Sequence, residues 1–65
     1  MLTADDVKAN AKMYGENWDT MNEESRKDLL LKLMREEIVE YAAEPIKIRR
    51  QAARDFAKLA ANMLK

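Results

Sequence analysis

The spacing of apolar residues along the chain predicts three helices and no strands. Apolar positions recur at intervals of three and four, as on one face of an α-helix, and no stretch alternates apolar and polar residues like a half-buried strand. The predicted helices cover residues 4–14, 21–43 and 46–64. We therefore expect an all-α fold in one small domain, residues 1–65, as a three-helix bundle or a dimeric helical bundle.

The first predicted helix is short and has a narrow apolar face. Thr3 stands at its capping position, and Asp5 and Asp6 put negative charge in the first turn, where the helix dipole favours it. Gly15 stands where a left-handed residue commonly ends a helix. The apolar face consists of Ala4, Val7, Ala11 and Tyr14.

The second predicted helix has more apolar surface than one neighbour would cover. The segment 20–23 fits a capping box that begins with Thr20, and Asn22 is a competing cap. Leu29 and Leu33 lie off the main apolar stripe, beside the acidic face. The main stripe consists of Leu30, Leu31, Met34, Ile38, Tyr41 and Ala42.

Pro45 separates the second and third predicted helices and allows two arrangements. Proline is favoured at the first helical position, and the residue before it avoids the helical region, which favours a hairpin. The missing Gly or Asn cap and the continuous phase of the apolar stripes favour one kinked helix instead. Both alternatives stay open at this point. The stripe of the third helix consists of Ile48, Ala52, Phe56, Leu59, Ala60 and Met63.

Composition removes several classes of function. The chain of 65 residues contains no His and no Cys, so imidazole catalysis, thiolate chemistry and disulfides are excluded. We expect no enzyme and no cofactor. The longest apolar run, residues 29–31, is far too short to cross a membrane, and the first residues lack the apolar segment of a secretory signal. We therefore expect no membrane association and a cytoplasmic location.

The net charge of zero conceals an uneven distribution. Residues 1–44 carry six basic and eleven acidic side chains, a net −5, whereas residues 45–65 carry six basic and one acidic, a net +5. The spacing of the basic residues places most of them on one face of the third helix. That face is suited to an acidic protein surface or to nucleic-acid phosphates, or it pairs with the acidic segment. Its members are Lys47, Arg50, Arg54, Lys58 and Lys65.

Three carboxylates of the acidic segment share a helical face in this prediction: Glu37, Glu40 and Glu44. We expect a solvated face and no bound metal, and these three are the candidates for a divalent cation. The stretch 36–40, Glu-Glu-Ile-Val-Glu, resembles the first half of the EExxE motif of the all-α nucleoside triphosphate pyrophosphohydrolases, the MazG-like family. The resemblance implies Mg²⁺-dependent hydrolysis. The family completes its site with ExxD on the next helix, where this chain has Asp55 but lacks the partner Glu.

Two further features suggest contacts with other molecules. Trp18, alone in the connection after the first helix, either closes the end of a small core or anchors a partner. The apolar excess favours a homodimer in which two copies build a four-helix core. The residues behind this expectation are Met21, Leu29, Leu33, Met34 and Met63.

Residues 21–34 are similar to the phycobilisome-degradation adaptor family, whose members pair a short helix with a long one and form dimers; Pro45 and the basic third helix depart from that pattern. The similarity implies a small dimeric adaptor.

We expect a non-enzymatic homodimer that binds another protein with an acidic surface, as an adaptor, inhibitor or regulator, for example a viral accessory protein. A nucleic-acid-binding regulator is the alternative, and the pyrophosphohydrolase is the second. The expected binding residues are Lys47, Arg50, Arg54, Lys58 and Trp18.

Overall fold

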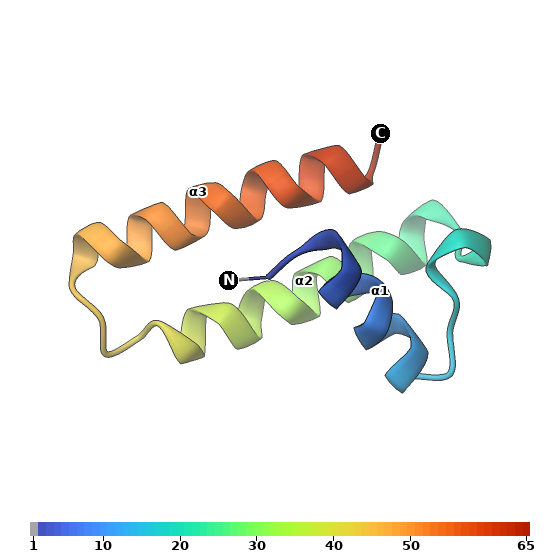
Figure 1. Cartoon of the computed structure of the whole chain (residues 1–65), viewed down its shortest axis with the longest axis horizontal. Helices are drawn as coiled ribbons and strands as arrows, with labels where there is room; N and C mark the ends of the chain where they lie inside the picture. Colours follow the sequence, from blue (N-terminus) through green and yellow to red (C-terminus); the bar gives the residue numbers. More distant parts are fainter. Residues whose placement is uncertain (1) are drawn as a thin grey trace.

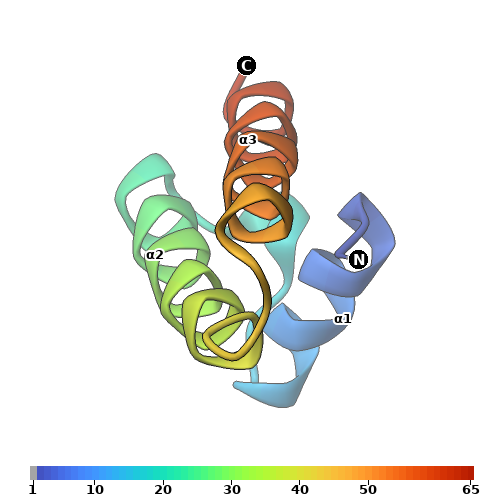
Figure 2. The ribbon, with the colours of Figure 1, turned by 90° about the vertical axis from the view of Figure 1, so that its left-hand side faces the viewer.

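The computed structural model describes residues 2–65 and has four helical elements: α1 (Ala4–Met13), the short 3₁₀ helix η1 (Trp18–Thr20), α2 (Glu23–Glu40) and α3 (Ile46–Met63). Figure 1 shows α2 and α3 side by side and antiparallel. The end-on view in Figure 2 places α1, α2 and α3 at the corners of a triangle. The all-α prediction is confirmed, and the observed helices are shorter than predicted by one to five residues.

Both ends of α1 are capped as the sequence predicts. The Thr3 hydroxyl accepts the Asp6 N–H at 3.2 Å, and the Asp6 carboxylate accepts the Thr3 N–H at 2.9 Å, which completes a capping box. At the other end Gly15 has a φ of 76°. The N–H groups of Gly15 and Glu16 donate to the carbonyls of Lys12 and Ala11, the pattern of a Schellman motif.

The start of α2 settles the competition between two caps. The Asn22 side chain accepts the Ser25 N–H at 2.8 Å, so Asn22 is the cap. The capping box predicted from Thr20 is wrong, because Thr20 belongs to η1 and its hydroxyl donates to the Asn17 carbonyl. A Thr in a 3₁₀ turn satisfies its hydroxyl locally and is no longer placed to cap the next helix.

The junction at Pro45 is a hairpin. The N–H of Tyr41 still donates to Glu37, but the next bonds are short turns, and the Glu44 N–H reaches only to Tyr41. Pro45 then opens α3: its carbonyl accepts the N–H groups of Ile48 and Arg49 at 3.0 and 3.1 Å. The chain therefore reverses between residues 41 and 45, and the continuous kinked helix does not occur in the structure.

The core lies where α1 and η1 cover the α2–α3 pair. It corrects the predicted stripe of α2: Leu33 is only 1 % exposed, and Leu29 beside it is buried, whereas Leu31 and Ile38 are 47 % and 61 % exposed. The reason is that α1 and α3 pack on α2 from two different directions, so the side of α2 between them is buried. The apolar pattern of α2 alone does not contain those directions. The buried residues are Val7, Ala11, Trp18, Leu29, Leu30, Leu33 and Phe56.

Arg26 joins η1 to α2. Its Nε donates to the Trp18 carbonyl at 2.9 Å, a terminal nitrogen donates to the Asp19 carbonyl at 3.3 Å, and the guanidinium lies 5.1 Å from the centroid of the Trp18 ring. Trp18 is thereby held in the core as a plug, with 6 % of its surface exposed. Of the two roles expected for Trp18, closing the end of the core is the one this burial fits, and it leaves little indole surface for a partner.

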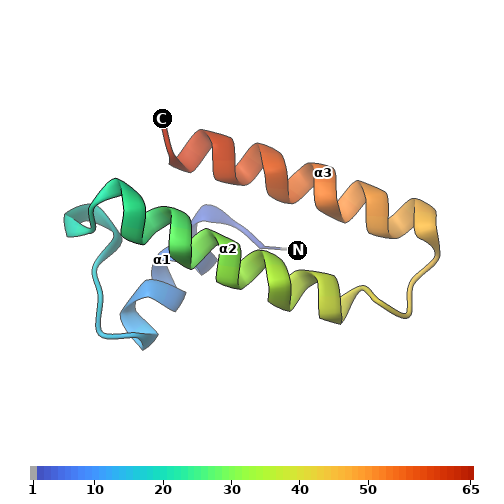
Figure 3. The same cartoon turned by 180° about the vertical axis from the view of Figure 1, so that it is seen from behind.

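The three helices do not cover one another along their whole length. Figures 1 and 3 show that α1 lies along the half of α2 nearer its start, and that the hairpin extends beyond it. We call residues 37–52, which include the turn, the hairpin end. The remainder of the molecule, where α1 and η1 cover the other two helices, is the closed end.

Candidate functional site

Four basic residues form an exposed face along α3. Lys47, Arg50, Arg54 and Lys58 all lie on the solvent side, and by helical spacing this is the side opposite the buried Phe56. We call these four residues the basic face. At 1.5 Å per residue they extend over about 16 Å of helix. Lys65, which the sequence adds to this row, is exposed beyond the end of α3.

The basic face is not neutralised by the acidic segment of the same chain. Within residues 2–65 the salt bridge found is an exposed pair on α2, Lys27 with Glu23 at 3.3 Å. The only acid on α3, Asp55, accepts a hydrogen bond from Gln51 at 2.9 Å. Pairing between the two charged stripes inside one chain, which the sequence allowed, is therefore not what the structure shows.

The predicted acidic face is interrupted. Because α2 ends at Glu40, Glu44 falls in the turn, and the shared face of Glu37, Glu40 and Glu44 does not form. Glu37 is half-buried, and its partial burial, together with the nearby Glu40 charge, raises the pKa of its carboxyl above the ordinary value. Among residues 2–65 no three acidic side chains gather as they would around a cation.

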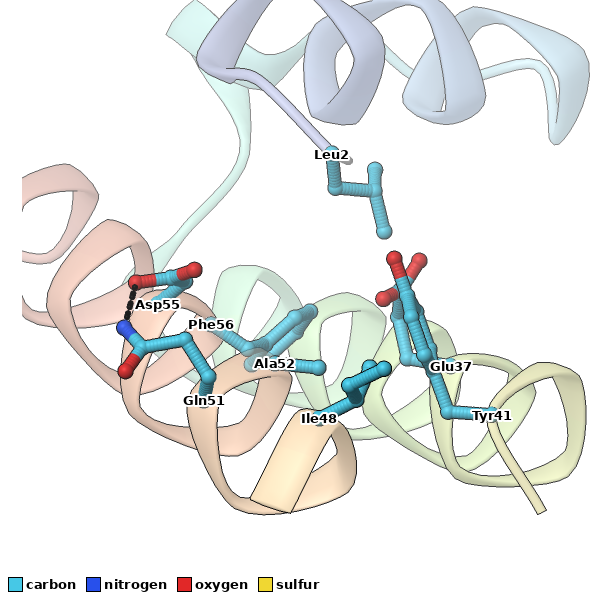
Figure 4. A pocket seen from close by; sticks show the side chains of 8 residues that line it. All are labelled: Leu2, Glu37, Tyr41, Ile48, Gln51, Ala52, Asp55 and Phe56. Carbon is cyan, nitrogen blue, oxygen red and sulfur yellow. Dashed lines mark hydrogen bonds between the residues drawn. The ribbon is translucent and has the colours of Figure 1, made fainter. Parts of the chain in front are cut away.

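One pocket lies between the N-terminal segment and the α2–α3 pair. Figure 4 shows Leu2 facing Glu37 and Tyr41 across it, with Asp55 on the opposite helix. Asp55 lies on the helix that would carry ExxD, the second half of the pyrophosphohydrolase motif. Here α3 supplies one carboxylate, already bonded to Gln51, beside apolar side chains. The pocket is completed by Ile48, Ala52 and Phe56.

A second, larger hollow lies on the other side of the α2–α3 pair. It is an open groove of about 490 Å³, which we call the hairpin groove. Its exposed large apolar members are Ile38 at 61 % and Ile46 at 57 %, one on each helix, and Glu37, Arg49 and Arg50 supply its charged groups. The remaining lining is Met34, Tyr41, Ala42, Ala52, Ala53, Phe56 and Ala57.

The groove was not predicted from the sequence, because the apolar excess was assigned to other residues. Leu29 and Leu33 belong to the core, and the three methionines of that set pack against it. The exposed apolar side chains of the hairpin end are instead Ile38, Val39, Ile46 and Ile48. A signal for this was present: Ile46 follows Pro45 directly, so a hairpin necessarily brings it close to the end of α2.

No family model matches this chain, and no curated protein or solved structure shows significant similarity to it. None of the helices within residues 2–65 combines the length and apolarity that crossing a membrane requires. The described residues offer two exposed surfaces for binding, the basic face and the hairpin groove.

Proposed function

We propose that this protein is a small, non-enzymatic helical binding protein, an adaptor or inhibitor, whose basic face binds an acidic surface of another protein. We further propose that it acts in the cytoplasm. The chemistry of the chain supports a binding role, since it has neither His nor Cys for general-base or nucleophilic catalysis.

The observation that carries the proposal is that, within residues 2–65, none of the four cations of the basic face pairs with a carboxylate. Long cationic side chains lined up along a rigid helix present a fixed row of donors, and opposite charge on a partner speeds the encounter and sets its register. Each exposed pair contributes only about 0.2–1 kcal/mol, so several must act together.

Triple alanine substitution tests this assignment. The variant Arg50→Ala/Arg54→Ala/Lys58→Ala removes three charges from the basic face, and its matched control, Lys8→Ala/Lys12→Ala/Arg35→Ala, removes three exposed charges elsewhere. Both keep or raise helix propensity, so circular dichroism should match the wild type. Each protein is immobilised and exposed to an extract of the native host.

We expect the wild type and the control to retain the same acidic protein at moderate salt, and the basic-face variant to lose it. Equal retention by both triple variants would contradict the proposal. If none of the three immobilised proteins retains a partner, the proposal is contradicted as well, since the basic face would then have no protein partner.

Nucleic acid is the second candidate, because Arg50, Arg54 and Lys58 repeat at every fourth residue with no acid between them on that face. Four phosphate contacts would make the logarithm of the affinity fall with the logarithm of salt at a slope of about −4. Fluorescence anisotropy with a labelled duplex at two salt concentrations measures this slope. The absence of binding at low salt would remove this candidate.

A further inference from the structure

Two exposed large apolar side chains, Ile38 and Ile46, line one hollow with a defined shape, whereas Met13, Tyr14 and Leu31 are exposed on other parts of the molecule. Ile38 on α2 and Ile46 on α3 rise on the two sides of the hairpin groove, and alanines form much of the wall between them. Small residues allow another helix to approach closely, and large apolar residues on either side give it something to pack against. The groove is therefore shaped to accept helices.

The amount of exposed surface is what a dimer of this size requires. A monomer of 7.6 kDa is expected to expose about 4,300 Å². This chain exposes 4977 Å², an excess of about 700 Å². A standard stable interface buries about 800 Å² on each partner. The excess is close in size to one side of such an interface.

The charges around the groove are self-complementary. A two-fold interface brings the same surface together twice, so each acid needs a base on that same surface. The hairpin groove has this composition, with Glu37 on the α2 side and Arg49 and Arg50 on the α3 side. Within residues 2–65 none of these three forms an ion pair in its own chain. A partner with one sign of charge would leave part of this set unmatched.

From these three observations we infer that the hairpin groove binds a second copy of this chain, so that two hairpins pack about a two-fold axis into a four-helix core. This inference shares one residue, Arg50, with the proposed function, and the variants that test it below leave all four residues of the basic face unchanged. Lys47, Arg54 and Lys58 do not line the groove, so three of the four residues of the basic face stay exposed in the dimer.

Two neighbouring residues provide a matched test. Ile38 lines the groove, whereas Val39, 75 % exposed and adjacent in α2, does not. Ile38→Asp and Val39→Asp place the same charge near the same helix end, at positions whose exposure spares the fold. Sedimentation equilibrium over a wide concentration range should give a dimer for the wild type and Val39→Asp, and should raise the dissociation constant of Ile38→Asp about ten- to a hundredfold.

A monomeric wild type at all concentrations would overturn the inference and assign the groove to a different protein. A dimer that Ile38→Asp and Val39→Asp weaken equally, or that neither weakens, would overturn it too, since the contact would then lie elsewhere.

A charge exchange tests the two-fold arrangement itself. In Glu37→Lys each groove carries only basic groups, and in Arg49→Glu two acids share the single base Arg50, so each variant alone should dimerise more weakly than the wild type. Both changes suit the helix dipole, since they put a cation near the end of α2 and an anion near the start of α3, and the monomers should stay folded. An equimolar mixture should form a heterodimer that restores the affinity severalfold. No recovery in the mixture would contradict the pairing of these residues across the axis.

Discussion

The two ends of this molecule are built from the same two helices and differ in whether a third helix covers them. At the closed end α1 and η1 lie on α2 and α3, and all seven buried residues gather there. At the hairpin end no third helix covers the pair, Leu2 of the N-terminal segment faces it across a pocket, and the exposed apolar side chains are Ile38, Val39, Ile46 and Ile48. A helix of 10 residues spans about 15 Å and one of 18 about 27 Å, so α1 cannot cover the whole of α2. The comparison places the core at the closed end, and on our proposal the hairpin end is where two copies associate.

The largest expected difference in the loss of stability on alanine substitution is between two leucines of α2 that are two residues apart. Leu33→Ala should destabilise the fold by about 2–5 kcal/mol, because Leu33 is 1 % exposed at the meeting point of the three helices. That is a large part of the stability of a domain this small. Leu31→Ala, at a half-exposed position outside the core cluster, should cost far less. Urea unfolding of the two variants compares them, and equal losses would contradict this view of the closed end.

Substitution of Arg26 is expected to have the second-largest effect on stability. Arg26→Ala removes the hydrogen bonds to the Trp18 and Asp19 carbonyls, and bonds from a charged donor contribute about 1.5–3 kcal/mol. The Trp18 fluorescence should shift to the red as η1 loosens. Lys27→Ala is the control, since it breaks only the exposed pair with Glu23 and should change stability by less than about 1 kcal/mol. An unchanged Trp18 spectrum in Arg26→Ala would show that η1 is held by other contacts.

The cap of α1 should have a smaller effect that depends on pH. Thr3→Ala should cost about 0.5–2 kcal/mol. The Thr3 N–H donates to the Asp6 carboxylate and lowers the pKa of Asp6 in the folded state. The cap therefore contributes stability above the pKa that Asp6 has when unfolded, and this contribution is lost as the pH falls through the lower, folded value. Thr3→Ala keeps the backbone N–H that donates to Asp6, so the pH dependence is tested with Asp6→Asn, which removes the carboxylate. Thermal melts of wild type and Asp6→Asn between neutral and acid pH should converge on acidification; a constant difference would contradict the role of Asp6.

Glu37 is expected to have the smallest effect, and one of opposite sign. Because its folded-state pKa is raised, ionised Glu37 weakens the fold, so Glu37→Gln should slightly stabilise the isolated chain at neutral pH. The gain should disappear as the pH falls below the pKa of unfolded Glu. The measurement is thermal unfolding in dilute solution, where association does not contribute. A loss of stability at neutral pH would mean that a favourable contact of Glu37 outweighs its desolvation.

Local features of this fold could be predicted from the sequence, and arrangement in space could not. The Thr3 cap and the Gly15 helix end follow from short-range chemistry, and both are as expected. The apolar stripe of α2 was misplaced by about a quarter turn, because the direction of the core is decided by where α1 packs. The hairpin groove could not be predicted either, since Ile38 and Ile46 face a common hollow only once the turn at residues 41–45 is formed. The basic face could be predicted, because residues spaced three and four apart lie on one side of a helix regardless of how the other helices pack.

The separation of roles between the two ends is tested most directly by the dependence of the melting temperature on protein concentration. Association stabilises the folded chain by mass action, so the wild-type melting temperature should rise with concentration. Val39→Asp should show the same rise, and Ile38→Asp, with the closed end intact, should show it only at concentrations about ten- to a hundredfold higher. A wild-type melting temperature that does not change with concentration, or a rise that Ile38→Asp retains in full, would contradict the account.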